Sequence, residues 1–319
     1  MTIFRLLNYK GSNGKPRPGL LVKGRVVDLT NALGQERAAG FPVTSTLDIL
    51  AAWDRARPAL AAIAEAADGD PKGSLAGGAP ALDDVELMSP LLYPSSIFCI
   101  AANYADHHKE MSGESTLPDK RTVTPTFFQK TPRQTVVGHG ARIHLPRTST
   151  AIDWEAELAV VIGRPAFGVS VDDAMDYVAG FTIMNDMSVR APRRHENNTE
   201  ADRKLRADRF RRKNFDGSSP LGPWITPREF VKDPYDLPIK LWVNGQLMQD
   251  GNSRHMHYTI EEQISYLSEH LTLWPGDVIS TGTPAGVGAG KGIYLKAGDE
   301  IVTTVGDLGT LTTTFVPSK

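Results

Sequence analysis

Two glutamates separated by one residue, Glu155 and Glu157, lead into an apolar run that ends at Gly163, within TAIDWEAELAVVIG. The run is rich in Val and Ile, which predicts a buried β-strand. Successive side chains on a strand point to opposite faces, so the two carboxylates share one face. Neighbouring carboxylates at the point where a strand enters the core repel each other and lose hydration. A hard divalent cation would compensate for both the repulsion and the lost hydration. In the alternative interpretation the strand enters from solvent, and both glutamates are hydrated or paired with arginines.

Asp186 supplies a third carboxylate at the polar end of a second strand pattern, GFTIMNDMSVR. If this end lies beside Glu155 and Glu157, three carboxylate oxygens converge and leave coordination positions open for water and substrate. That arrangement is typical of magnesium or manganese sites. The alternative is that Asp186 caps the following turn, as Asn-Asp pairs often do.

His107 and Glu110 lie three residues apart in NYADHHKEM, on a helical turn that Asn103 is expected to cap. Residues at this spacing share a helix face. A carboxylate beside an imidazole fixes its tautomer and raises its basicity, which is how a water-activating general base is built. The alternative is an incidental ion pair on a solvated helix start. Residues 112–125, polar and containing two prolines, are expected to form a mobile lid.

The segment 190–213 is dominated by arginine and lysine. Beside a carboxylate-metal site it would attract a dianionic substrate and position its carboxylate through Arg190 or Lys213. The alternative is a solvated, exposed segment. Phe210 is its one aromatic residue and the whole chain has a formal net charge of -2, so nucleic acid is an unsuitable partner.

The elements that must position these residues fall into two parts. The 319 residues suffice for two domains of unequal size. Short strands are expected up to about residue 35, followed by a helix over 46–67 that Pro58 interrupts. The Gly/Pro-rich segment 68–81 is the best linker candidate. We therefore predict a small N-terminal domain over residues 1–85, linker included, and a main domain over 86–319.

The C-terminal third is predicted to be rich in strands. Asn244 and Gly245 are expected to form the turn of a hairpin. Thr259 and Glu262 form the capping-box pattern of a helix start. The loop TGTPAGVG follows a strand and could hold an anion with its backbone N–H groups. Together these patterns indicate an α+β, β-rich fold.

The single cysteine, Cys99, lies in an apolar stretch and is expected to be a core residue. It cannot form an internal disulfide. No apolar run approaches the length of a membrane span, and the first residues lack the apolar stretch of a secretory signal. We therefore expect a cytoplasmic enzyme or binding protein without a membrane partner.

Five motifs in order, NYADHHKEM, DWEAELAVVIG, GFTIMNDMSVR, RRKNFDGSSPLGPW and PGDVISTGTPAGVG, resemble the fumarylacetoacetate hydrolase family. The resemblance covers roughly residues 85 to 316, and the ordered set is far more specific than any one motif. It implies a β-rich roll of mixed, barrel-like sheets with few helices, paired as a homodimer.

The resemblance also implies roles for nine residues of this chain. These are Glu155, Glu157 and Asp186 as ligands for Mg²⁺ (or Mn²⁺ or Ca²⁺), His107 and Glu110 as the water-activating dyad, Lys213 as a catalytic lysine near the metal, and Arg190, Thr283 and Lys130 as substrate contacts. The chain departs from the family at Ala191, where an aspartate usually follows the arginine. We expect either that a contact supporting the site is lost here or that Glu196 or Glu200 supplies it, which leaves the substrate class open but not the metal site.

The function expected from this resemblance is hydrolysis of a carbon–carbon bond in an acylpyruvate-like 2,4-diketo acid, giving pyruvate and a carboxylic acid. One alternative is a decarboxylase, isomerase or tautomerase acting on a related β-keto or 2-hydroxy-dienoic acid. The His107–Glu110 pair favours hydrolysis, because isomerases of this family tend to lack it. An alternative of another class is a non-catalytic module that binds a metal or ligand.

Overall fold

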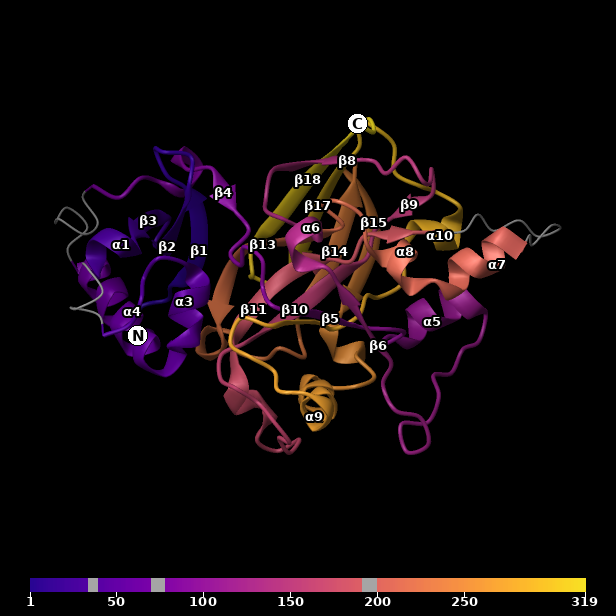
Figure 1. The fold of residues 1–319 in the computed structure, drawn as a ribbon, viewed down its shortest axis with the longest axis horizontal. Coiled ribbons are helices and arrows are strands. Elements are labelled where there is room, and N and C mark those ends of the chain that lie inside the picture. Colours follow the sequence, from indigo (N-terminus) through magenta and orange to yellow (C-terminus); the bar gives the residue numbers. More distant parts are fainter. Residues whose placement is uncertain (34–39, 70–77, 191–199) are drawn as a thin grey trace.

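The computed structural model describes residues 1–33, 40–69, 78–190 and 200–319, and their strands form three sheets (Figure 1). The largest sheet has the order β3-β2-β1-β13-β11-β10-β16-β5-β6, with β4 beside β1 and β7 beside β13. Its strands are β1 (Arg5–Lys10), β2 (Pro16–Val22), β3 (Arg25–Asp28), β4 (Leu87–Met88), β5 (Ile97–Ile100), β6 (Phe127–Lys130), β7 (Val136–Val137), β10 (Ala156–Ile162), β11 (Val178–Asn185), β13 (Ser219–Pro227) and β16 (Val278–Ser280).

A second sheet of five strands has the order β15-β14-β17-β18-β8, and two short strands pair separately. Their bounds are β8 (Ala141–His144), β14 (Pro238–Val243), β15 (Gln246–Asn252), β17 (Glu300–Val305) and β18 (Thr310–Val316), with β9 (Ile152–Asp153) and β12 (Ser188–Val189) as the short pair. Parallel pairs occur beside antiparallel ones, as in β16–β5 and β18–β8. Neither large sheet closes into a barrel over the described residues. The predicted strand-rich α+β class is confirmed.

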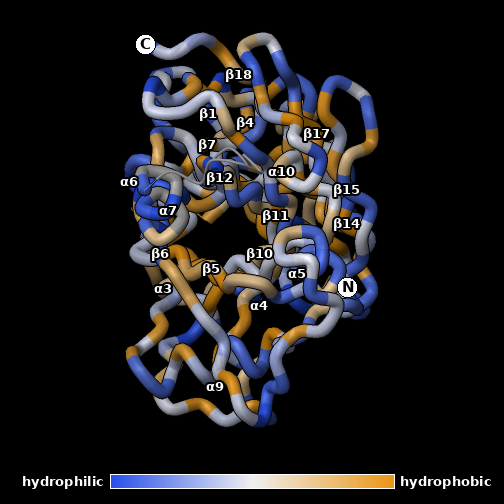
Figure 2. Tube along the Cα trace, turned by 90° about the vertical axis from the view of Figure 1, so that its right-hand side faces the viewer, coloured by the Kyte–Doolittle hydropathy of each residue, from blue (hydrophilic) through white to orange (hydrophobic). Residues whose placement is uncertain are grey.

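The helices of the described residues lie around these sheets (Figure 1). They are α1 (Leu29–Ala32), α3 (Thr46–Ala51), α4 (Trp53–Gly69), α5 (Ala105–Ser112), α6 (Pro132–Thr135), α7 (Glu200–Ala207), α8 (Arg209–Lys213), α9 (Ile260–His270) and α10 (Gly288–Lys291). Short 3₁₀ turns lie at Leu82–Asp84, Ala174–Tyr177, Arg228–Phe230 and Ser253–His255. Figure 2 shows α7 as hydrophilic, whereas β5, which is buried along its length, is hydrophobic. No described helix combines the length and apolar character needed to cross a bilayer.

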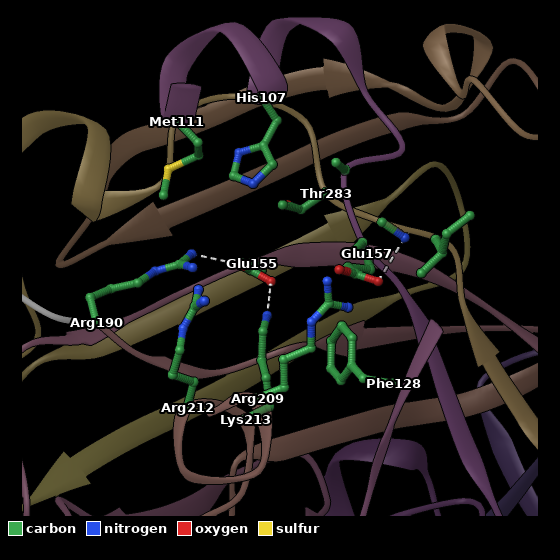
Figure 3. A pocket seen from close by; sticks show the side chains of 14 residues that line it. His107, Met111, Phe128, Glu155, Glu157, Arg190, Arg209, Arg212, Lys213 and Thr283 are labelled. Carbon is green, nitrogen blue, oxygen red and sulfur yellow. Dashed lines mark hydrogen bonds and ion pairs between the residues drawn. The ribbon is translucent and has the colours of Figure 1, made fainter. Parts of the chain in front are cut away.

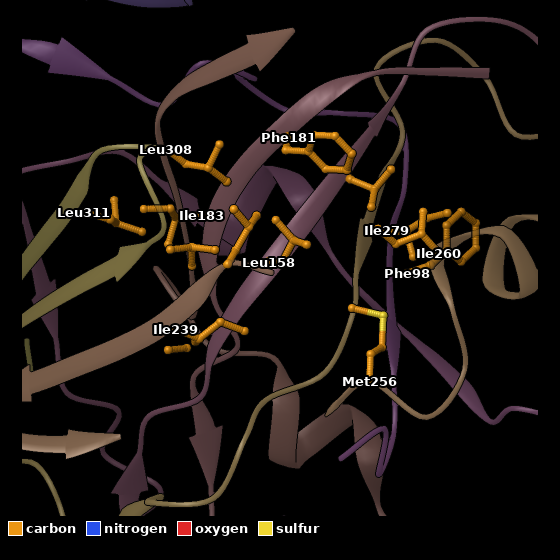
Figure 4. Close-up of a cluster of buried hydrophobic side chains, with 14 of the residues drawn as sticks. Phe98, Leu158, Phe181, Ile183, Ile239, Met256, Ile260, Ile279, Leu308 and Leu311 are labelled. Carbon is orange, nitrogen blue, oxygen red and sulfur yellow. The ribbon is translucent and has the colours of Figure 1, made fainter. Parts of the chain in front are cut away.

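Strand β10 separates two hydrophobic cores, because both of its faces are buried. Leu158 and Val160 belong to one core, and in Figure 4 Leu158 lies among Ile183 and the side chains around it. Ala159 and Val161 belong to the other. A strand buried on both sides reads as a continuous apolar run rather than an alternating one, as this sequence does.

The N-terminal strands continue the large sheet, since β1 pairs with β13 through Leu6 and Ile225. The second core contains residues from both sides of position 85, including Trp53 and Val161. The two-domain division at residue 85 stays a prediction, and the shared core shows that the two parts pack together.

The helical segment expected over 46–67 is confirmed as two helices, but the place of its interruption and one cap were wrongly predicted. The break lies at Ala52, which leaves helical geometry, and Pro58 lies inside α4. The helix continues through Pro58 because its apolar face, with Leu60, is buried in the core, which offsets the lost backbone hydrogen bond. Asn103 does not cap α5: its side chain donates to the Thr281 carbonyl at 2.8 Å and accepts from the Tyr258 amide at 2.7 Å.

Other local predictions are confirmed. The capping box of Thr259 and Glu262 is present at the start of α9. Asn244 and Gly245 both have positive φ at the hairpin between β14 and β15, as this tight turn requires. Cys99 is fully buried, and burial raises the pKa of its thiol well above the usual value.

Candidate active site

The three predicted carboxylates converge where β10 begins and β11 ends. The register of these strands pairs Ala156 with Asn185, and the Asp186 amide donates to the Glu155 carbonyl at 2.9 Å. One oxygen from each of Glu155, Glu157 and Asp186 lies within 4.8 Å of the others, and all three side chains are buried. The pairing of two strands distant in sequence therefore assembles the cluster.

Three cationic side chains bind this cluster. Lys213 donates to Glu155 at 2.5 Å and to Asp186 at 2.6 Å. Lys130 donates to Asp186 at 2.7 Å. Arg190 donates to Glu155, and also to Asp153 at 2.8 Å. We call the group formed by Lys130, Asp153, Glu155, Glu157, Asp186, Arg190 and Lys213 the acidic cluster, because four carboxylates meet three cations.

Glu157 is the carboxylate of the cluster that has no cationic partner among the described residues. It accepts hydrogen bonds from the Ser280 hydroxyl at 2.5 Å and from the Gly282 amide at 2.8 Å. Burial and the nearby carboxylates Asp186 and Glu155 raise its pKa to about 8. The cluster therefore carries one more carboxylate than its cations balance.

Glu155 and Lys213 behave as a charged pair. Burial would raise the pKa of the Glu155 carboxyl, but Lys213 and Arg190 hold it well below its usual value. Burial would lower the pKa of the Lys213 ammonium, but Asp186 and Glu155 raise it above its usual value. Both groups are therefore ionised at neutral pH. The carboxylate that no cation balances is Glu157.

The donor set fits a hard divalent cation. All three ligands are carboxylate oxygens, which magnesium and manganese prefer, and their mutual repulsion is not fully compensated by the protein. A cation there would ionise Glu157 and share Glu155 and Asp186 with the ammonium of Lys213.

The glycine-rich loop that follows β16 binds carboxylates of the protein itself. Its Gly282 amide donates to Glu157 at 2.8 Å, its Gly286 amide to Glu110 at 3.1 Å, and its Gly288 amide to Asp153 at 2.6 Å. The sequence predicted that these amides could hold an anion, and the anions are side chains of the site. At Gly282, φ is +94° and a Cβ would lie 2.7 Å from Asn103, so the turn requires glycine.

A pocket of about 190 Å³ lies above the cluster (Figure 3). His107 and Met111 of α5 form one side of it, and Arg190, with Arg209, Arg212 and Lys213 of α8, forms the opposite side. Glu155 and Glu157 lie between the two walls. The volume is below that of a drug-sized ligand site, roughly 300–1,000 Å³, and suits a small metabolite.

The predicted pair of His107 and Glu110 is present on α5. The distance from His107 Nδ1 to Glu110 Oε2 is 3.4 Å, which is long for a hydrogen bond, and both side chains are mostly buried. Glu110 is also held by the Gly286 amide. The imidazole faces the pocket, while its carboxylate partner is held by the glycine-rich loop.

The residues predicted to contact substrate have other partners in the structure. Arg190 lines the pocket but its guanidinium binds Asp153 and Glu155. Lys130 is 2% exposed, does not line the pocket and binds Asp186, so it positions that carboxylate. Thr283 lines the pocket, but its hydroxyl donates to the Ala156 carbonyl at 2.8 Å. Their roles as substrate contacts remain predictions.

Sequence reasoning missed Asp153 and Gln249. Asp153 extends the spacing of Glu155 and Glu157 by one more step of two residues, a signal that was available. Gln249, fully buried, accepts from the Ala156 amide and donates to the Thr283 hydroxyl, and nothing in its local sequence indicates this.

Arg190, the residue before Ala191, is bound by Asp153. Of the two glutamates expected to replace the aspartate, Glu200 pairs with Lys204 on the surface at 2.7 Å. Glu196 and Ala191 itself lie outside the described residues.

The chain is similar to known enzymes along most of its length. A family model described as fumarylacetoacetate hydrolase C-terminal matches residues 96–316. The 2,4-didehydro-3-deoxy-L-rhamnonate hydrolase of Sphingomonas sp. (strain SKA58) is 35% identical over 305 residues, covering 94% of this chain and 92% of that protein. The oxaloacetate tautomerase of Bacillus subtilis (strain 168) is 39% identical over 236 residues, covering 72% of this chain and 73% of that protein.

A solved structure shares the whole fold. Maleylpyruvate hydrolase from Sphingobium sp. SYK-6, in complex with manganese(II) and pyruvate, is 28% identical, with a TM-score of 0.74 over 99% of this chain and 100% of that one. The family match spans the carboxylate cluster, the His107–Glu110 pair and the glycine-rich loop. This chain belongs to the fumarylacetoacetate hydrolase family.

Proposed function

We propose that this protein is a metal-dependent hydrolase that cleaves the carbon–carbon bond of an acylpyruvate-like 2,4-diketo acid. The observation that carries the proposal is that His107, backed by Glu110, faces Glu155 and Glu157 across a small pocket. A proton acceptor on one wall that faces a carboxylate cluster suits a reaction in which water attacks one carbonyl and an enolate leaves.

Glu155, Glu157 and Asp186 would hold Mg²⁺, or alternatively Mn²⁺ or Ca²⁺. The bound ion supplies Lewis-acid polarisation of the keto oxygens and charge stabilisation for the enolate. Lys130 and Arg190 hold Asp186 and Glu155 in place, and such supporting contacts orient metal ligands. The related maleylpyruvate hydrolase structure contains manganese(II), which supports a divalent ion here.

In the proposed reaction His107 takes a proton from water, and the water oxygen forms a bond to the C4 carbonyl carbon. Glu110 holds the imidazole in the tautomer that accepts this proton. The C3–C4 bond then breaks, and its electron pair passes into the enolate of pyruvate, beside the Lys213 ammonium. Protonation at C3 by the His107 imidazolium gives pyruvate, and the acyl part leaves as a carboxylic acid.

The names of two relatives support a diketo-acid substrate. The relative that matches nearly the whole chain acts on a 2,4-didehydro-3-deoxy acid, whose name describes carbonyl groups at carbons 2 and 4. The structural neighbour acts on maleylpyruvate, an acylpyruvate.

A second candidate function is tautomerisation of a β-keto acid such as oxaloacetate. The observation that favours it is the 39% identity to the oxaloacetate tautomerase of Bacillus subtilis. His107 could move a proton between carbon and oxygen without an attacking water. A decarboxylase would use the same acidic cluster. In a non-catalytic binding module, His107 would have no catalytic role.

The test follows the ultraviolet absorbance of acetylpyruvate and fumarylpyruvate, with Mg²⁺ and again with a chelator. Metal-dependent loss that yields pyruvate plus the matching acid is the expected result. Conversion of enol-oxaloacetate to the keto form without consumption of either diketo acid would assign the tautomerase. Release of carbon dioxide from oxaloacetate would assign the decarboxylase, and no turnover of any substrate would leave a binding module.

The homodimer and the cytoplasmic location also stay predictions. Light scattering of the purified protein at micromolar concentration measures the first, and a monomer at all concentrations would contradict it.

A further inference from the structure

The wall of the pocket formed by α8 carries more positive charge than the acidic cluster uses. Lys213 is bound by Glu155 and Asp186, and Arg190 is bound by Glu155 and Asp153. These two cations, which the sequence suggested for the substrate carboxylate, are therefore already neutralised by the protein. Any anion recognised by the rest of the pocket must use other groups.

Arg209 and Arg212 also line this pocket. They are three residues apart on α8, so they share a helix face, and in Figure 3 both reach toward the space between the α8 wall and the glutamates. Arg209 lies over the ring of Phe128, with its guanidinium carbon 5.9 Å from the ring centroid. Among the described residues, no carboxylate lies within ion-pair distance of Arg209.

The guanidinium groups repel one another. Burial lowers the pKa of Arg212, and the charges of Arg190 and Arg209 lower it further, while Glu155 opposes them. Like charges gathered at one wall of a small pocket raise the local positive potential and favour an anionic ligand. The planar fork of an arginine matches a carboxylate with two parallel hydrogen bonds.

We propose that Arg209 and Arg212 form a second anion subsite, which binds a carboxylate on the acyl part of the substrate. The chain is then selective for dianionic diketo acids, with the keto-acid end at the acidic cluster and the distal carboxylate at α8. The inference rests on the proposed function for the reaction, but the subsite itself is a statement about binding.

Binding is measured first, without turnover, by calorimetry on the Mg²⁺-loaded protein. The probes are 2-oxoglutarate and 2-oxopentanoate, which have the same chain length and differ in the distal carboxylate. We expect the dianion to bind at least about tenfold more tightly, since hydrogen bonds to charged groups contribute roughly 1.5–3 kcal/mol. Arg212→Gln should reduce this preference by about tenfold, and Arg209→Gln by about threefold because Arg209 is more exposed.

Arg211→Gln is the matched control, because Arg211 is an exposed neighbour on α8 that does not line the pocket. It should leave the preference unchanged. Arg212→Lys keeps the charge without the fork and should retain part of the preference. Equal losses for both probes in Arg212→Gln and Arg209→Gln would overturn the proposal, since the arginines would then bind the shared keto-acid end. Unchanged binding of both probes would overturn it too.

Turnover separates this inference from the proposed function. If fumarylpyruvate and acetylpyruvate are both hydrolysed, the ratio of their kcat/KM values should fall in Arg212→Gln and stay constant in Arg211→Gln. Hydrolysis with an unchanged ratio would overturn the subsite and leave the hydrolase intact. An arginine-dependent preference in binding, with no hydrolysis of either diketo acid, would support the subsite and overturn the hydrolase.

Discussion

Two polar clusters of this protein contrast in how their charges are balanced. Beside the N-terminal strands, Asp28 accepts hydrogen bonds from Tyr9, from the Arg17 guanidinium and from the Asn31 amide. We call this the Asp28 cluster: one carboxylate faces one guanidinium, and both carboxylate oxygens are occupied. The acidic cluster instead sets four buried carboxylates against three cations. A balanced cluster stabilises a fold, whereas an unbalanced buried one indicates a missing ligand.

The pKa values of the two clusters move in opposite directions. Burial alone would raise the pKa of Asp28, but the hydrogen bonds from Arg17 and Tyr9 outweigh burial and hold this pKa below its usual value. Burial and two neighbouring carboxylates raise the pKa of Glu157 to about 8. Burial acts in the same direction on both, so the partners decide the outcome.

The largest expected effect is that of Glu157→Gln, which removes the unbalanced carboxylate and keeps its shape. Metal-dependent turnover should fall by at least about 10³-fold, because a metal ligand that supports several kcal/mol of charge stabilisation is lost. Thermal unfolding of the metal-free protein at pH 9 should occur at a higher temperature than in wild type, because a repulsive buried charge is gone. A lower unfolding temperature would show that Glu157 is structural, like Asp28.

His107→Ala tests the general base on the pocket wall that faces the acidic cluster. We expect the turnover number for diketo-acid hydrolysis to fall by about 10²–10⁴-fold, the usual contribution of general base catalysis. Metal binding by calorimetry and the unfolding temperature should stay close to wild type. Normal hydrolysis by a folded variant would remove His107 from the proposed reaction.

Asp28→Asn should lower stability and leave turnover unchanged, which is the reverse of the effects expected for the acidic cluster and His107. The free energy of unfolding is expected to fall by about 1–2 kcal/mol, because the charge-assisted hydrogen bonds of Arg17 are weakened in a partly exposed setting. Since the folded-state pKa of Asp28 lies below its unfolded value, this contribution is present above pH 4 and is lost as the pH falls. Urea unfolding at pH 7 measures the loss, and turnover should be unchanged. A variant that lost activity while keeping its stability would contradict the contrast.

The smallest expected effect is the release of a proton from Glu157 when the metal binds. Between pH 4.5 and about 8, folded metal-free protein holds a proton on Glu157 that the unfolded chain does not, so its stability should decrease as the pH rises through this window. Metal binding requires the ionised carboxylate and should release up to about one proton at pH 7. Calorimetric titration with Mg²⁺ in two buffers of different ionisation enthalpy measures the release. Identical heats in both buffers would mean that Glu157 is already ionised.

The sequence by itself indicated the acidic residues of the site and the family. The spacing of Glu155 and Glu157 places both on one strand face, and that spacing depends only on the two-residue period of an extended chain. The three-residue spacing of His107 and Glu110 is likewise local. Five ordered motifs then indicated the family that the comparisons confirm. Local geometry and ordered motifs can be recognised in the sequence without knowledge of the packing.

Only the tertiary structure decided how these groups are balanced and held. The register of β10 against β11 places Asp186 beside Glu155, and amides of the distant glycine-rich loop bind Glu157 and Asp153. Packing also engaged Arg190 and Lys213 with carboxylates and placed Arg209 and Arg212 of α8 along the pocket. Partners that lie far apart in the sequence meet through the packing of the sheets, so local patterns could supply the charged residues without pairing them.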